Sequence, residues 1–390
     1  MKIRKILKRC TAAMLAAAIG MTTLAANVSA ATSGVSIGYT WNSSVNPTIK
    51  NRKNGVTGGV SGQYIKAGEQ ICRFSPSSTS DWAFCIEPAK SMQGASYKDW
   101  YTQNGFTKYD TFDLSDKNKA DSFAYWKSIG GTDGPMAKYL GLVQYYGYSS
   151  HKTGDYYAAT QCLIWELILG YRGHTQAGFG KCSDILWNDF TYPSGGWCTR
   201  SGVEKAYNDI VSNVKDHYKL PSAMRSTKAQ AKDEPNVMKY NAENLRYETK
   251  VTVPTSYVTA SSLAHNFSSL ESKLGSLIKS KFSGTFGKDY GLETEMSGTN
   301  TVYTIWSKER QFTSSGDSSI YVTESIPMQM KNSLKKQETL FANSYYQTCL
   351  LSTRLDPVVG YVGLASYNEP NLTVEKTYTD SSNNQITAAE

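Results

Sequence analysis

The hydrophobic period of the chain changes twice along its length, and this change most restricts the folds that it can adopt. Residues 36–104 carry short alternating apolar and polar runs, which predict strands joined by Gly and Ser turns. From 105 to 235 apolar residues recur at helical spacing, with glycines and Pro135 as punctuation. Alternation then returns over 236–369. This order predicts an α+β fold: a β-sheet or β-barrel-like scaffold of N- and C-terminal strands, with an inserted helical subdomain.

Residues 1–30 have the layout of a secretory signal peptide. Five basic residues precede an apolar run, and small residues end the segment at Ala30, where cleavage is expected. Export would lower the formal net charge from +8 to +3 by removing those five basic residues, which weakens any case for nucleic-acid binding. No later stretch approaches the roughly 20 apolar residues of a membrane span, so no membrane insertion of the mature chain is expected.

Six cysteines follow the signal peptide, in a compartment that favours disulfides, and six thiols allow fifteen connectivities. Cys182–Cys198 is the first disulfide predicted, because the two residues bracket a loop expected at 174–200. Cys72–Cys349 is a weaker prediction. The cysteines and histidines lack the short paired spacings of metal sites, so no metal is predicted, and no sequence motif indicates a cofactor.

Two apolar segments each contain one residue that needs an explanation. In 155–171, which predicts a helix, Gln161 interrupts a stripe of apolar side chains. A buried carboxamide without partners costs roughly 1 to 3 kcal/mol, so Gln161 must be hydrogen-bonded or used chemically. The second segment is a predicted strand around Cys85, which Pro88 would end or hold at a sheet edge. Its two faces carry Trp82, Phe84 and Ile86 on one side, and Ala83, Cys85 and Glu87 on the other.

Both residues have an ordinary structural interpretation. Gln161 would bond to the backbone of a neighbouring strand, and Cys85 would be a packed or disulfide-bonded cysteine. A thiol and a carboxamide held together in a dry site can also condense, so that ammonia leaves and an internal thioester remains. Because water hydrolyses such a group, the protein would have to exclude solvent, with Trp82, Phe84 and Trp165 as candidate shields.

The two segments resemble the motifs of the thioester domains of Gram-positive bacterial surface adhesins. Phe84-Cys85-Ile86-Glu87 matches an aromatic or apolar residue, the reactive cysteine, an apolar residue and an acid. Gln161, followed by Ile164 and Trp165, matches the second motif. The resemblance implies one thioester domain over 36–369, in which Cys85 and Gln161 form the bond. Candidates for its surroundings are Trp82, Phe84, Glu87 and Trp165.

The resemblance also implies a function. The domain would be secreted to the bacterial cell surface and wall, where the thioester would capture an amine of a host surface protein, expected to be a lysine. A fibrinogen-like target is suggested by the family alone. The bond is not regenerated, so the domain would react once and would not be an enzyme. Residues 370–390 predict a linker and the start of a stalk module. No LPxTG-like sorting motif is present, so we expect either a longer wall-anchored protein or a released one.

Two rival functions remain open from the sequence. A non-covalent, disulfide-stapled module could bind protein or glycan through its many tyrosines and tryptophans. A secreted cysteine hydrolase would need a histidine near Cys85 to form the thiolate. The candidates are His151, His174, His217 and His265.

Overall fold

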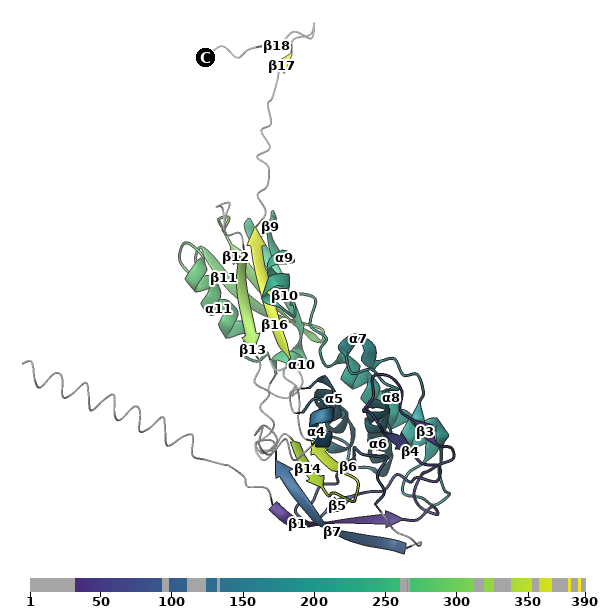
Figure 1. Ribbon diagram of the computed structural model, residues 1–390. Helices are drawn as coiled ribbons and strands as arrows, with labels where there is room; N and C mark the ends of the chain where they lie inside the picture. Colours follow the sequence, from purple (N-terminus) through teal and green to yellow (C-terminus); the bar gives the residue numbers. More distant parts are fainter. Residues whose placement is uncertain are drawn as a thin grey trace, which may run out of the picture. The chain divides into compact units, whose positions relative to one another are not determined.

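The structure of the chain is a computed structural model (Figure 1). It describes residues 32–92, 98–110, 124–131, 134–259, 265, 267–311, 319–325, 338–352, 358–366, 378–379 and 385–386. The predicted signal peptide and most of the predicted stalk start lie outside these ranges. Among the residues described, no helix is both long and apolar enough to cross a membrane.

The contacts divide the chain into two compact units. The first unit joins Met1–Lys219 with Pro327–Val358, and the second joins Leu220–Ile326 with Val359–Glu390. Each unit therefore contains one segment that returns from the far part of the sequence. The predicted extent of a single domain, 36–369, stays a prediction, and the two units subdivide it.

The first unit is built on a six-stranded sheet that combines early and late strands, as the sequence pattern predicts for the scaffold. Its order is β5-β1-β7-β14-β15-β6, and the pairings along it are antiparallel. The short strand β6 therefore lies at one edge, the position that Pro88 favours. The strands are β1 (Thr32–Trp41), β5 (Ser75–Pro76), β6 (Phe84–Cys85), β7 (Lys98–Asp110), β14 (Glu338–Ala342) and β15 (Cys349–Ser352).

The helices of the first unit lie between β7 and β14 in the sequence, and α5, α6 and α8 pack against one another (Figure 1). Two-residue strands and a π-helical turn accompany them, namely β2 (Thr48–Ile49), β3 (Lys53–Asn54), β4 (Tyr64–Ile65), β8 (Phe190–Thr191) and η1 (Tyr145–Ser149). The helical segments are α4 (Ala124–Ser128), α5 (Pro135–Gln144), α6 (Gly154–Leu169), α7 (Gln176–Phe179), the 3-10 turn η2 (Leu186–Asp189) and α8 (Arg200–Asp216).

Helix α6 is the central helix of the first unit, and its sequence explains both ends. The Thr153 side chain accepts a hydrogen bond from the Tyr156 N–H and caps the start. Gly170 ends the helix in the left-handed conformation, with φ of 82°. A Cβ at Gly170 would lie 2.4 Å from the backbone nitrogen of Gly59, so the close approach of this loop also requires glycine. Every residue from Tyr157 to the helix end is buried, as expected for a helix that is apolar all round.

The second unit has its own sheet and core. The sheet order is β11-β12-β10-β9-β16-β13, in which β16 runs parallel to β9. Helix α11 packs Leu270, Leu274 and Ile278 into an apolar cluster with the sheet. The elements are α9 (Lys228–Asp233), β9 (Asn236–Asn241), β10 (Arg246–Pro254), α10 (Thr255–Val258), α11 (Leu270–Lys281), β11 (Tyr290–Ser297), β12 (Asn300–Ser307), β13 (Ser319–Ser325) and β16 (Val359–Ser366). In the C-terminal segment of the same unit, β17 (Tyr378–Thr379) pairs with β18 (Gln385–Ile386).

The predicted α+β fold is confirmed. The helices expected within 105–235 lie between Ala124 and Asp233, whereas 105–110 belong to β7, and the later alternating strands are present. Helix α11 was not predicted, although its apolar residues recur every four positions in a segment that otherwise alternates.

Candidate functional site

Strand β6 and helix α6 bring Cys85 and Gln161 together in the first unit. Both side chains are fully buried. The Cys85 N–H donates to Gln161 Oε1 at 2.9 Å, and Gln161 Nε2 donates to the Cys85 carbonyl at 2.8 Å. The carboxamide is therefore aligned along the backbone of the residue whose thiol is its predicted reaction partner. The reaction itself stays a prediction.

The two hydrogen bonds also define what each atom can do. They satisfy the buried carboxamide, as the ordinary structural interpretation of Gln161 requires. The bond to Oε1 also polarises the carbonyl and would stabilise negative charge on that oxygen during nucleophilic attack. The same geometry therefore suits a structural glutamine and an electrophilic carbonyl, and only a test of the reactivity of Gln161 can distinguish the two roles.

The surroundings of Cys85 keep its thiol protonated. Burial raises the pKa of the Cys85 thiol, while the Trp165 side chain and the backbone at Glu87 act in the opposite direction. The negative charges of Glu69 and Glu87 raise this pKa further. A condensation would thus need a base to take the thiol proton. Burial raises the pKa of Glu69 to about 7, which is near the optimum for a general base at neutral pH.

Trp165 contributes a polar group that the shielding prediction did not consider. Its side chain is 1% exposed, and it stacks on Phe190 with ring centroids 6.2 Å apart. Its indole Nε1 is buried and makes no hydrogen bond to a described nitrogen or oxygen, and its side-chain hydrogen bond acts on the Cys85 thiol. Because Trp165 acts to lower the pKa of Cys85, the indole lies where it would stabilise a thiolate.

Phe84 and Trp82 form one aromatic cluster beside Cys85. The Phe84 ring stacks on Tyr157 at 4.5 Å, and Trp82 stacks on Tyr148 at 5.6 Å. The Arg73 guanidinium lies over Trp82 at 4.4 Å from the ring centroid. Phe84 is fully buried, whereas Trp82 is partly exposed. The structure therefore places both predicted shielding residues around the strand that carries Cys85.

A second thiol lies opposite Cys85, which the sequence did not reveal. Cys349 of β15 is the direct cross-strand partner of Cys85. The neighbouring Ile86 N–H donates to the Thr348 carbonyl at 3.0 Å, so Cys85 and Cys349 occupy a non-hydrogen-bonded pair. Cα atoms in such pairs are about 4.5 Å apart. Burial raises the pKa of the Cys349 thiol too.

Each of the six cysteines that the structure describes is a free thiol. The structure therefore does not contain the predicted Cys182–Cys198 bridge or the weaker Cys72–Cys349 pairing. Cys182 instead donates its thiol proton to the Asp184 carbonyl at 3.0 Å. Cys162, next to Gln161 in the sequence, is fully buried, and burial raises the pKa of its thiol.

An ion pair in the first unit anchors the C-terminal half of α6. Glu166 and Arg172 are both buried, with Arg172 Nε 2.8 Å from a Glu166 oxygen. The Tyr207 hydroxyl donates to the Glu166 carboxylate at 2.7 Å, and the Leu186 N–H donates to it at 3.0 Å. The carboxylate is thus fully partnered. This network connects α6 to α8 and to the loop after α6, a role that the spacing of Glu166 did not indicate.

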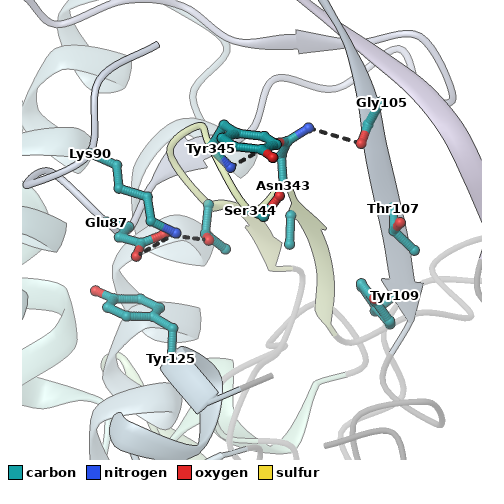
Figure 2. Close-up of a pocket in the computed structure, with 11 residues that line it drawn as sticks. Glu87, Lys90, Gly105, Thr107, Tyr109, Tyr125, Asn343, Ser344 and Tyr345 are labelled. Carbon is teal, nitrogen blue, oxygen red and sulfur yellow. Dashed lines mark hydrogen bonds and ion pairs between the residues drawn. The ribbon is translucent and has the colours of Figure 1, made fainter. Parts of the chain in front are cut away.

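Glu87 lies on a pocket at the edge of this site (Figure 2). It is 5% exposed, accepts a hydrogen bond from the Thr348 hydroxyl at 2.7 Å, and forms an ion pair with Lys90 at 3.0 Å. The Tyr125 hydroxyl donates to the carbonyl of Ile86. The pocket has a volume of about 650 Å³ and therefore falls in the size range of ligand sites.

Three of the four histidines that the hydrolase alternative requires have other partners. His217 Nδ1 lies 2.9 Å from the Tyr146 hydroxyl, and His151 stacks on Tyr156. His265 stacks on Tyr257 with ring centroids 4.0 Å apart. Within the described ranges, no cluster of three or more His, Cys, Asp or Glu side chains could hold a metal ion.

Comparisons with known proteins give one structural likeness. No family model matches the chain, and no curated protein matches it. Among solved structures, the chain is similar to the thioester domain of the Staphylococcus aureus TIE protein, at 13% sequence identity and a TM-score of 0.36. The alignment covers 86% of this chain and 98% of that structure. A likeness this distant carries no argument about function, so the proposal below depends on the site.

Proposed function

We propose that the protein is a secreted adhesin domain with an internal thioester between Cys85 and Gln161. One observation carries the proposal: two hydrogen bonds hold the Gln161 carboxamide against the backbone of Cys85, in a site without solvent exposure. The resemblance of both sequence motifs to thioester domains supports the same pairing. Burial also supports it, because a thioester persists only where water is excluded.

Formation of the thioester needs atoms that the site supplies. The Cys85 sulfur attacks the Gln161 carbonyl carbon, and the Cys85 N–H stabilises the negative charge that develops on Oε1. A base must take the thiol proton, and the candidate is the buried Glu69, whose charge acts on the Cys85 thiol and whose pKa is raised to about 7. The carbon–nitrogen bond breaks, the proton passes to the departing nitrogen, and ammonia leaves. The products are one thioester and one ammonia.

Capture of a target reverses the roles of the two residues. A lysine amine attacks the thioester carbonyl, the carbon–sulfur bond breaks, and an amide forms on Gln161 while Cys85 regains a thiol. Trp165 stabilises the departing sulfur through its indole N–H, the side-chain hydrogen bond that acts to lower the pKa of Cys85. The amide is stable and the thioester is not regenerated. The domain thus reacts once and is not an enzyme.

The proposed partner is a protein on a host surface. An exported domain meets such proteins outside the cell, and the signal-peptide pattern of residues 1–30 supports export. Display on a bacterial cell wall and a fibrinogen-like target follow from the resemblance to surface adhesins. The site itself supports the reacting group, an amine, rather than a particular partner.

Methylamine labelling tests the proposal. We expect peptide mapping of the mature chain, incubated with methylamine, to locate one adduct on Gln161. A Cys85→Ala variant should remain unlabelled, and the matched variant Cys162→Ala should be labelled like the wild type because its thiol belongs to the next helix position. Labelling of Gln161 in Cys85→Ala would contradict the thioester.

The two rival functions predict different results. A non-covalent binding module would leave Gln161 unlabelled, with its two hydrogen bonds serving structure alone. A cysteine hydrolase would turn over and lose activity when its histidine is replaced. We expect each of the four single His→Ala variants to retain methylamine labelling.

A further inference from the structure

Three residues in the wall of the pocket lie next to Cys85 in the sequence or in the sheet, or contact a neighbour of Cys85. Glu87 follows Cys85 by two positions on the same segment, and Thr348 precedes Cys349, the cross-strand partner of Cys85. The third wall residue, Tyr125, bonds to the carbonyl of Ile86. Glu87 and Tyr125 both interact electrostatically with the Cys85 thiol, so an amine that reaches the pocket lies on the Cys85 side of the proposed thioester.

The pocket already binds a primary ammonium group. The Glu87 side chain is 7% exposed, and one of its oxygens receives the ammonium of Lys90 at 3.0 Å (Figure 2). The other oxygen accepts from Thr348, which fixes the carboxylate in place. The Lys90 side chain is 37% exposed, so it reaches this buried carboxylate from the solvent side. Because the Lys90 ammonium stays accessible to water, a competing ammonium can replace it on Glu87.

The rim of the pocket displays an aromatic side chain on a fixed turn. Tyr345 lies between β14 and β15 and is 81% exposed. The Asn343 side chain holds this turn, because its Oδ1 accepts from the Tyr345 N–H at 2.8 Å and its Nδ2 donates to the Gly105 carbonyl at 2.9 Å. A preorganised, exposed tyrosine is typical of the residues that anchor protein partners.

We propose that this pocket receives the attacking amine as the ammonium group of a partner's lysine, and that Lys90 occupies the receiving carboxylate, Glu87, until the partner arrives. This inference rests on the proposed thioester. The incoming ammonium replaces that of Lys90, and Glu87 takes one of its protons. The neutral amine attacks the Gln161 carbonyl carbon, the new carbon–nitrogen bond forms, and the carbon–sulfur bond breaks. The second amine proton goes to the Cys85 sulfur, and Glu87 returns its proton to water.

Two small nucleophiles distinguish this role from a structural one. Methylamine is protonated at neutral pH like lysine, whereas hydroxylamine is largely uncharged and does not need a carboxylate. We expect Glu87→Gln to slow the reaction with methylamine about tenfold or more and to leave that with hydroxylamine nearly unchanged. Lys90→Gln, which frees Glu87, should accelerate methylamine alone. Lys205→Gln is the matched control: it makes the same change at an exposed lysine of α8 that does not line the pocket, and both small nucleophiles should react with it at wild-type rates.

The measurement is the rate at which each adduct appears in the intact mass of the mature chain. The mass of each unreacted variant first shows whether one ammonia is missing, so failure of the thioester is separated from failure of the pocket. Equal slowing of both nucleophiles in Glu87→Gln, or no slowing of methylamine, would overturn the inference. Where Glu87→Gln does not form the thioester, Lys90→Gln decides, and unchanged methylamine rates in that variant would refute the role of the pocket.

Discussion

Opening the thioester should lower the stability of the first unit by a measurable amount. The proposed bond joins β6 to α6 across 76 positions of the chain. By the chain-entropy estimate for cross-links, closing a loop of that length removes about 15 cal/mol/K from the unfolded state, or about 4.5 kcal/mol at 25 °C. Real cross-links commonly contribute less, so we expect methylamine to lower the free energy of unfolding by about 2 to 4 kcal/mol.

Thermal unfolding followed by tryptophan fluorescence is a suitable assay. Of the eight tryptophans, Trp306 alone belongs by sequence to the second unit, so fluorescence reports mainly on the first. For a unit of this size, 1 kcal/mol shifts the midpoint by roughly 2 to 4 °C, which predicts a fall of about 5 to 15 °C after methylamine. The Cys85→Ala variant has no bond to open.

The unfolding midpoint of Cys85→Ala should therefore be low before any treatment and should not change with methylamine. The reasoning is refuted if methylamine modifies Gln161 in the wild type and the midpoint stays within about 1 °C. A bond that adds no stability would not connect the two elements that the structure brings together.

Three further predictions concern residues around the site. Glu166→Ala leaves the buried Arg172 without its carboxylate, and should lower the free energy of unfolding, measured in urea, by about 3 to 5 kcal/mol. A loss under about 1 kcal/mol would contradict a stabilising role for this ion pair. Burial raises the pKa of Glu69 from 4.5 to about 7, so between these pH values the native state binds more protons than the unfolded state. The free energy of unfolding should therefore fall by roughly 3 kcal/mol as the pH rises through that window. Glu69→Gln should remove this slope in unfolding measured from pH 4 to 8, and a slope that persists would assign it elsewhere. Trp165→Phe keeps the ring beside Phe190 but removes the indole N–H, and should slow the methylamine reaction about tenfold; an unchanged rate would exclude stabilisation of the departing sulfur.

Local patterns in the sequence predicted the elements that carry the site. The helical spacing around Gln161 and the alternation around Cys85 correspond to α6 and β6, because each pattern is set by residues a few positions apart. Pro88 likewise predicted the edge position of β6. The pairing of the two residues came from the resemblance to a known family, since no local pattern shows that a strand and a helix 76 positions apart will meet.

Several features that the sequence missed depend on long-range pairing. Cys349 lies opposite Cys85 only because β15 is the neighbour of β6 in the sheet, and sheet order is not visible in the spacing of cysteines. Cys182 and Cys198 are free thiols and do not form the predicted disulfide. Two cysteines that bracket a loop in the sequence need not lie close enough in space to bond. The Lys90 ion pair could have been suspected from its position three residues after Glu87, but the pocket beside it requires the turn at Tyr345.

The measurement that tests the central claim most directly is the intact mass of the freshly prepared mature chain, compared with that of Cys85→Ala under the same denaturing conditions. The thioester predicts a wild-type mass lower by one ammonia than the sequence requires, and a full mass for the variant. A wild-type chain with its full mass, which gains nothing from methylamine, would contradict the covalent mechanism and leave Gln161 as a structural residue.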